Sequence, residues 1–77
     1  MLKTLKNGEV AVLMQPVTTV NGFVIPEGTS IRGVKILTVT AMFDILPEIY
    51  CPYTDFLLYR RVLVRADNMY AKVNKLS

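Results

Sequence analysis

The chain contains no histidine, no tryptophan and only one cysteine, Cys51, among its 77 residues. Without histidine it lacks the side chain that most often acts as a general acid or base and as a metal ligand. A single thiol cannot form an internal disulfide, and with scattered carboxylates it does not complete a zinc site. The four glycines, at positions 8, 22, 28 and 33, fit neither a phosphate loop nor a dinucleotide-binding fingerprint. We therefore expect no enzyme activity, no metal site and no cofactor.

The remaining candidates for chemistry are interpreted as structural. Cys51 has no neighbouring base and no helix start that would lower its pKa, so it is interpreted as an inert thiol. Asp44, Glu48 and Asp55 do not have the spacing of a calcium-binding loop, and they are interpreted as a solvated acidic segment.

Long apolar runs are also missing. The longest segment without charge, residues 10–26, contains a glutamine, two prolines, an asparagine and a glycine, so it is not a membrane span. The N-terminus has neither a long apolar stretch nor a small-residue cleavage site, so we expect no signal peptide. With the lone cysteine, these features predict a cytoplasmic protein that does not associate with membranes.

Hydrophobic residues, in contrast, are plentiful: they make up 52% of the chain, against 19% charged residues. Such a chain is too apolar to remain disordered, and its length supports only one core. We predict a single domain over residues 1–77. Apolar side chains that a small core cannot hold favour an interface, so a homo-oligomer is one expectation.

The pattern of the first third predicts short strands. Residues 9–17 alternate as a strand does, and Pro16 is expected to end the pairing because it has no N–H group to donate. Asn21-Gly22 predicts a tight turn, and the Pro-Glu-Gly sequence predicts a second reversal over residues 25–28.

The rest of the chain continues the β pattern with one interruption. Residues 30–44 are nearly all β-formers, and a slip of the apolar phase near residues 36–37 predicts a bulge or a sharp bend that Gly33 assists. Two prolines within six residues predict a loop over residues 45–55. Residues 56–66 give the clearest strand, followed by one helical turn at "ADNMY" and a last short strand.

These segments together resemble the SH3-like small barrels of bacterial and phage proteins. In many of those domains a long strand ends in a phrase such as "VPADNL", makes one tight helical turn and continues into a terminal strand. The segment "LVRADNMYAKV", from Leu63 to Val73, is similar, with Arg65 in place of the usual proline. The resemblance implies an all-β, SH3-like barrel of about five bent antiparallel strands with one short helical turn near the C-terminus. Members that recognise PxxP ligands use a tryptophan, so that specificity is not expected here.

The predicted loop supplies the first candidate binding surface. It carries four large side chains among prolines and acids, which are Leu46, Ile49, Tyr50 and Tyr53. A core of this size can hardly bury all of them, and tyrosines are effective contact residues. Two interpretations stay open: residues 45–53 fold back as a lid over one end of the barrel, or they contact a protein partner.

The second candidate surface is basic. Over the last eighteen residues five cations outnumber the one anion, Asp67, which gives a net charge of +4. The cations are Arg60, Arg61, Arg65, Lys72 and Lys75. Together with nearby tyrosines, these cations are suited to binding phosphates and to stacking on bases. Adjacent strand residues point to opposite faces, however, so the competing interpretation is solvated charge that protects an edge strand.

The main functional hypothesis is a non-enzymatic protein-binding module, an accessory or inhibitory factor of phage or bacterial type, with residues 45–53 at its contact surface. The alternative is RNA or DNA binding through the basic C-terminal third. A structural role within a homo-oligomer or a virion is the third hypothesis.

Overall fold

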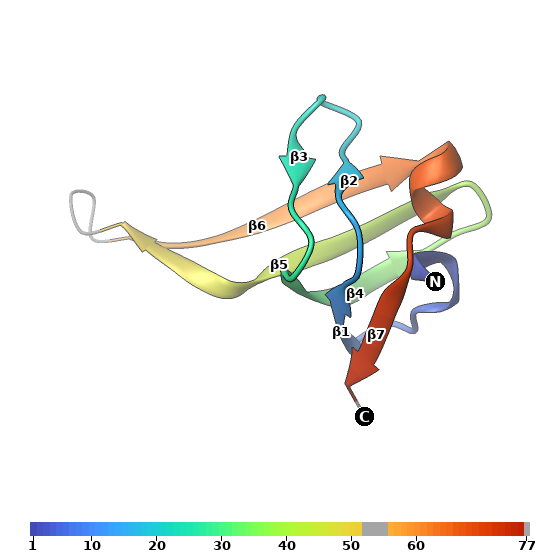
Figure 1. Cartoon of the computed structure of the whole chain (residues 1–77). Coiled ribbons are helices and arrows are strands. Elements are labelled where there is room, and N and C mark those ends of the chain that lie inside the picture. Colours follow the sequence, from blue (N-terminus) through green and yellow to red (C-terminus); the bar gives the residue numbers. More distant parts are fainter. Residues whose placement is uncertain (52–55, 77) are drawn as a thin grey trace.

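A computed structural model describes residues 1–51 and 56–76, with side chains described for residues 1–46 and 61–76. The described chain consists of strands of two to twelve residues and two 3-10 turns (Figure 1). In chain order the elements are η1 (Leu2–Thr4), β1 (Val10–Leu13), β2 (Val17–Thr18), β3 (Val24–Ile25), β4 (Ser30–Ile36), β5 (Thr40–Cys51), β6 (Phe56–Arg65), η2 (Ala66–Tyr70) and β7 (Val73–Leu76).

Five strands form one sheet in the order β6-β5-β4-β1-β7, and β2 and β3 form a separate hairpin. Every pair is antiparallel. The chain leaves β6 through η2 and returns as β7 at the other edge of the sheet, beside β1. The predicted all-β class, the small antiparallel sheet and the helical turn near the C-terminus are therefore confirmed.

One hydrophobic core joins these elements. Its largest fully buried side chains are Phe43, Leu2, Leu13, Ile25, Ile31, Met69, Val17 and Val64. They come from the five-stranded sheet, from both strands of the small hairpin and from both 3-10 turns, so each of these elements is fixed by burial of its own apolar residue.

The alternation of strand side chains separates two faces of the sheet. In β5, Ala41 and Phe43 are 0% exposed on the face that borders the core. Asp44 lies on the opposite face, because successive strand residues point to opposite sides. We call this second face, over β4, β5 and β6, the outer face.

The turns follow the sequence closely. Gly22, with φ +83°, closes the β2–β3 hairpin, where the Thr19 N–H bonds the carbonyl of Phe23. Gly28, with φ +86°, ends the predicted reversal after β3. Positive φ is the conformation that glycine adopts without steric cost. Both predicted turns are confirmed.

Residues 30–44 do not form the one long strand that their composition suggests. The chain reverses after Ile36, where the Leu37 N–H bonds the carbonyl of Thr40, and the segment becomes the two strands β4 and β5. The slip in apolar phase therefore marks a hairpin turn. The bulge lies earlier, between Gly33 and Lys35, where a β-carbon on residue 33 would sit 2.5 Å from the Lys6 carbonyl oxygen.

The predicted loop over residues 45–55 is wrong for the part that the structure describes. β5 continues through Pro47 to Cys51, and its pairing with β6 is interrupted only between Ile45 and Ile49. Proline donates no ladder hydrogen bond, but a register irregularity of this kind accommodates it within a strand. Pro47 thus marks a break in the pairing, whereas Pro52 is among residues 52–55, which lie outside the described part.

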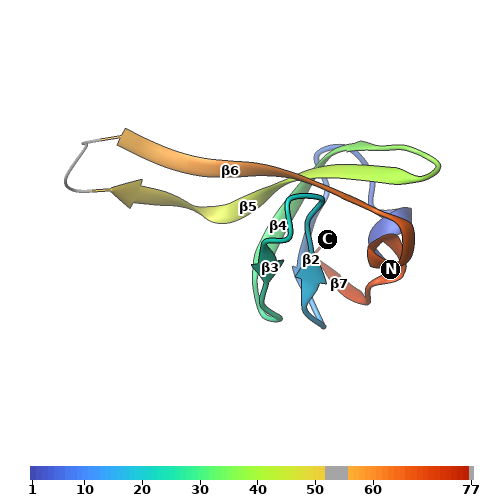
Figure 2. The same ribbon diagram turned by 90° about the horizontal axis from the view of Figure 1, so that it is seen from above.

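This continuation produces a projecting ribbon. β4 accompanies β5 only as far as Leu46, which lies opposite Ser30. Farther out, β5 and β6 pair with each other at Ile49↔Leu58, Tyr50↔Leu57 and Cys51↔Phe56. The ribbon extends well away from the other elements (Figures 1 and 2). We call residues 47–51 and 56–60 the arm, and residues 1–46 and 61–76 the body.

The N-terminal segment is more structured than its sequence indicates. Leu2 is buried in η1, and its N–H bonds the carbonyl of Ala71, which joins the start of the chain to the segment after η2. Leu5 is 3% exposed and would contact any side chain placed at residue 33. Within the residues described, no helix is both long enough and apolar enough to span a membrane.

Candidate interaction surfaces

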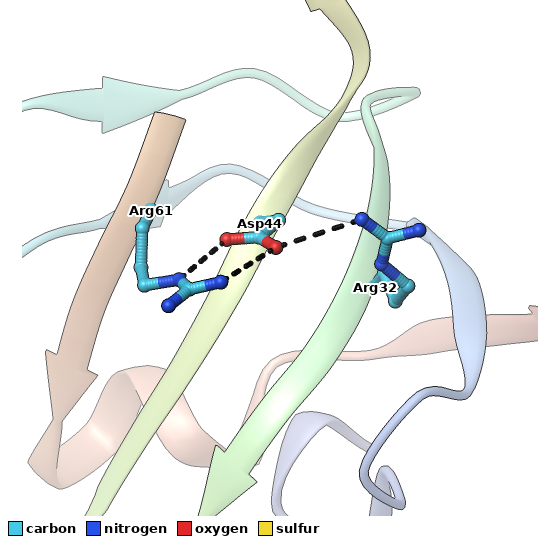
Figure 3. Close-up of polar contacts among 3 residues, drawn as sticks. All are labelled: Arg32, Asp44 and Arg61. Carbon is cyan, nitrogen blue, oxygen red and sulfur yellow. Dashed lines mark hydrogen bonds and ion pairs between the residues drawn. The ribbon is translucent and has the colours of Figure 1, made fainter. Parts of the chain in front are cut away.

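Three charged side chains lie in a row across the outer face. The sheet register places Asp44 opposite Arg32 on β4 and opposite Arg61 on β6. Arg61 donates from Nε to Asp44 Oδ1 at 2.9 Å and from Nη2 to Oδ2 at 3.3 Å. Arg32 Nη2 lies 3.7 Å from the same Oδ2 (Figure 3). One carboxylate therefore ties together three adjacent strands.

In this row Asp44 is buried, whereas Arg32 and Arg61 are exposed to solvent. The Asp44 side chain is 3% exposed, whereas those of Arg32 and Arg61 are 44% and 49% exposed. The hydrogen bonds from Arg61 lower the pKa of Asp44 against the opposing effect of burial, and the charges of Arg61 and Arg32 add to the decrease. Asp44 is ionised at neutral pH, and the row presents a net charge of +1 to water.

Two further cations share the outer face. Lys35 lies opposite Met42, which in turn lies opposite Leu63, and Arg65 lies opposite Thr40. Both Lys35 and Arg65 are exposed, and the ion pairs of the described residues include neither. The described outer face thus carries four cations and one anion, a net charge of +3.

A groove borders this face at the edge of β6. It has a volume of about 590 Å³ and lies between the tip of the β2–β3 hairpin and the strands β5 and β6. The Val20 N–H bonds the carbonyl of Leu63, which fixes the tip against β6. Phe23 and Val20 line the groove and are 43% and 39% exposed. Its lining also includes Met42 and Leu63, so the groove is largely apolar, with Arg61 as its charged member.

The structure does not gather the five predicted cations into one patch. Arg60, Arg61 and Arg65 belong to β6, whereas Lys75 belongs to β7 at the opposite edge of the sheet and Lys72 directly precedes β7. Lys75 Nζ is engaged within the body, 2.9 Å from the Thr4 carbonyl oxygen and 3.6 Å from Glu9 Oε1. Arg60 lies opposite Ile45 in the register, and its side chain is outside the described set.

The predicted protein-binding residues fall on the arm and at its base. Leu46 is half-buried at the last position that β4 accompanies. Ile49 and Tyr50 are paired positions of the arm, opposite Leu58 and Leu57. Tyr53 lies outside the described residues. The arm runs away from the core in both views, and in neither does it lie across the end of the body (Figures 1 and 2).

The sequence did not predict Phe23 in the groove, nor three contributors to the outer face: Arg32, Lys35 and Met42. Their grouping depends on the register between β4, β5 and β6 and on the bulge after Gly33. A single strand reveals its own alternation, but not which residues of a neighbouring strand lie opposite. The isolated aspartate between two basic strand segments was the one available signal.

No group of three or more Cys, Asp or Glu side chains in the described part of the chain is placed to hold a metal ion. No buried polar side-chain atom there lacks a hydrogen-bond partner. No family model, curated protein or solved structure shows significant similarity to this chain.

Proposed function

We propose that this protein is a non-enzymatic protein-binding module of SH3-like type and that the arm contacts its partner protein. The observation that carries this proposal is the arm itself: two strands that leave the five-stranded sheet and are paired there only with each other, within the residues that the structure describes.

The composition of the arm favours a protein partner. Its three described pairs join Ile49 to Leu58, Tyr50 to Leu57 and Cys51 to Phe56, and none of these residues is charged. An isolated two-stranded hairpin is at best marginally stable in water. A ribbon whose sequence is rich in large apolar residues is typical of a segment that another protein covers, and tyrosine supplies rigid contact area with a polar end.

The SH3-like assignment rests on the pattern of the C-terminal third. η2 follows β6 directly and leads into β7, in the order that the resemblance implies for "LVRADNMYAKV". Phage or bacterial origin, and a role as an accessory or inhibitory factor, belong to the same proposal and rest on that resemblance.

The test is capture of partner proteins from lysate of the native cells, with nuclease present so that nucleic acid does not bridge. Three forms of the tagged protein are compared: the parent, the double variant Tyr50→Ala with Tyr53→Ala, and the matched control Tyr70→Ala. Tyr70 is 57% exposed on the body, so its loss removes an exposed tyrosine without changing the arm.

The parent and the control are expected to capture the same protein, and the double variant to capture about tenfold less, as expected for the loss of central aromatic contacts. A photoreactive phenylalanine at position 50 should crosslink to that protein, whereas the same group at position 70 should not. Equal capture by the double variant, or crosslinking from position 70 alone, would overturn the proposal.

A further inference from the structure

We infer that the outer face of the body is a binding site for single-stranded nucleic acid, with the groove beside Phe23 receiving a base. The inference goes beyond the proposed function, since it concerns a different part of the molecule and does not depend on the arm.

The first support is the arrangement of charge. Arg32 and Lys35 lie on β4, and Arg61 and Arg65 lie on β6, with β5 between them. Neighbouring strands are about 4.8 Å apart, so the two lines of cations run side by side at about 10 Å. A phosphate backbone that follows β5 would pass between two lines of positive charge, which is the electrostatic complement of a single strand.

Asp44, the only described anion on the outer face, does not cancel the positive potential of the four cations. The Asp44 side chain is 3% exposed and is held by both arginines, whose own side chains are about half exposed, at 44% and 49%. The buried carboxylate fixes the direction of the two guanidinium groups on the outer face. Asp44 therefore acts as a positioning residue for Arg32 and Arg61.

The second support is the apolar groove adjoining the cations. Met42 lies in the row between Lys35 and Leu63, and Met42 and Leu63 both line the groove with Phe23. An aromatic ring beside arginines is the combination on which unpaired bases stack. A duplex keeps its bases stacked inside and would use the cations alone. The juxtaposition of charge with an exposed aromatic ring thus favours a single strand.

The experiment measures fluorescence anisotropy of labelled dT20 and rU20 oligonucleotides with the full-length protein between about 20 and 200 mM NaCl. Binding of at least one oligonucleotide is expected, with log affinity falling against log salt with a slope of about −2 to −3, as for three to four phosphate contacts on a single strand. The two oligonucleotides distinguish DNA from RNA as the source of the strand.

Substitutions then locate the site. Lys35→Glu and Arg65→Glu should each weaken binding about tenfold at low salt and reduce the salt slope by about 1. Lys72→Glu is the matched control: it makes the same change in net charge at an exposed residue outside the outer face, and it should weaken binding less than about threefold. Phe23→Ala should weaken binding about tenfold while leaving the salt slope unchanged.

Three outcomes would overturn the inference. Absence of binding to both oligonucleotides at 20 mM NaCl would remove the site. Equal losses in Lys35→Glu and Lys72→Glu would show that binding follows net charge rather than the outer face. Equal competition by polyglutamate or by a 20-base-pair duplex, with no effect of Phe23→Ala, would show a surface for acidic protein or duplex instead. Urea unfolding of each variant confirms that the altered proteins are folded.

Discussion

The body and the arm share two continuous strands and differ in what holds them. In the body, β5 lies between β4 and β6 and buries Ala41 and Phe43 completely. In the arm, β6 is the one strand that pairs with β5 among the residues that the structure describes. The body is therefore stabilised by its own core, whereas the arm, as a two-stranded ribbon, adds little stability of its own.

The two faces of the sheet differ within the body. The core face holds the elements together, and the outer face carries the charge row of Arg32, Asp44 and Arg61 with the neighbouring cations. The proposals accordingly assign two separate surfaces: a protein contact on the arm and a single-stranded nucleic acid on the outer face. Substitutions that separate stability from binding can test this division.

The largest expected effect on stability is in the body. Phe43→Ala should lower the free energy of unfolding by about 3–5 kcal/mol, because it removes the largest of the fully buried side chains in the described core. Urea denaturation followed by circular dichroism measures the loss. Tyr70→Ala, at an exposed aromatic residue of η2, serves as the control and should cost less than about 1 kcal/mol. Similar losses in both variants would contradict a single core centred on Phe43.

Acid should weaken the charge row of the outer face. The pKa of Asp44 in the folded protein lies below the ordinary value of 3.8, chiefly because of the hydrogen bonds from Arg61. The carboxylate therefore stabilises the fold above about pH 4, and this contribution is lost as the pH falls through the folded-state pKa. Asp44→Asn should cost about 1–2 kcal/mol at pH 7, and the difference from the parent should shrink toward pH 2.5.

Urea unfolding of the parent and the variant at each pH measures this difference in the free energy of unfolding. Glu9 is present in both proteins, so its own effect on stability cancels in the difference. The pKa of Glu9 is lowered too, mainly because its carboxylate accepts a hydrogen bond from the Lys6 N–H. Asp67→Asn removes one exposed carboxylate elsewhere and should change stability by less than about 0.5 kcal/mol. A difference between Asp44→Asn and the parent that stays constant down to pH 2.5 would show that ionisation of Asp44 does not stabilise the fold.

Local signals in the sequence predicted much of the body. Asn21-Gly22 and Gly28 specify turns through positive φ, and the helical turn at residues 66–70 follows from its place after the alternating strand. These features depend on neighbours in the chain. The SH3-like barrel assignment, which rests on the resemblance, stays a prediction. The function and the binding residues also stay predictions.

The errors concern which segments pair with each other. Residues 36–37 and Pro47 both mark changes in the β pattern, yet the first is a hairpin reversal and the second an irregularity within a continuing strand. Only the partner strand distinguishes the two, because a bulge is defined by the residues opposite. The basic outer face was missed for the same reason: Arg32 and Arg61 lie far apart in sequence and meet through Asp44.

Removing the arm sharpens the comparison between the two regions. A variant in which Asn-Gly replaces residues 46–59 joins Ile45 to Arg60, which are already opposite each other, through a tight hairpin turn. The free energy of unfolding should stay within about 1 kcal/mol of the parent, because a two-stranded ribbon adds little stability of its own. Partner capture should be lost, and binding of dT20 or rU20 should persist.

Urea unfolding, capture from lysate and anisotropy measure these three properties on one protein. A loss of several kcal/mol would mean that the arm belongs to the cooperative core. Loss of oligonucleotide binding with unchanged stability would place the nucleic-acid contact on the arm, against the assignment to the outer face.

The smallest expected effect lies where β6 meets η2, at the end of the strand opposite the arm. Ala66 has φ +56°, the only positive φ of a non-glycine residue in the part of the chain that the structure describes. The left-handed conformation costs an alanine about 1–2 kcal/mol, and glycine escapes this cost while losing about 0.4–1 kcal/mol through greater freedom of the unfolded chain. Ala66→Gly should therefore stabilise the body by about 0.5–1 kcal/mol, whereas Ala66→Val, with a branched β-carbon, should destabilise it. Thermal unfolding of the two variants measures opposite shifts in Tm, and a lower Tm for Ala66→Gly would show that the left-handed turn is not a source of strain.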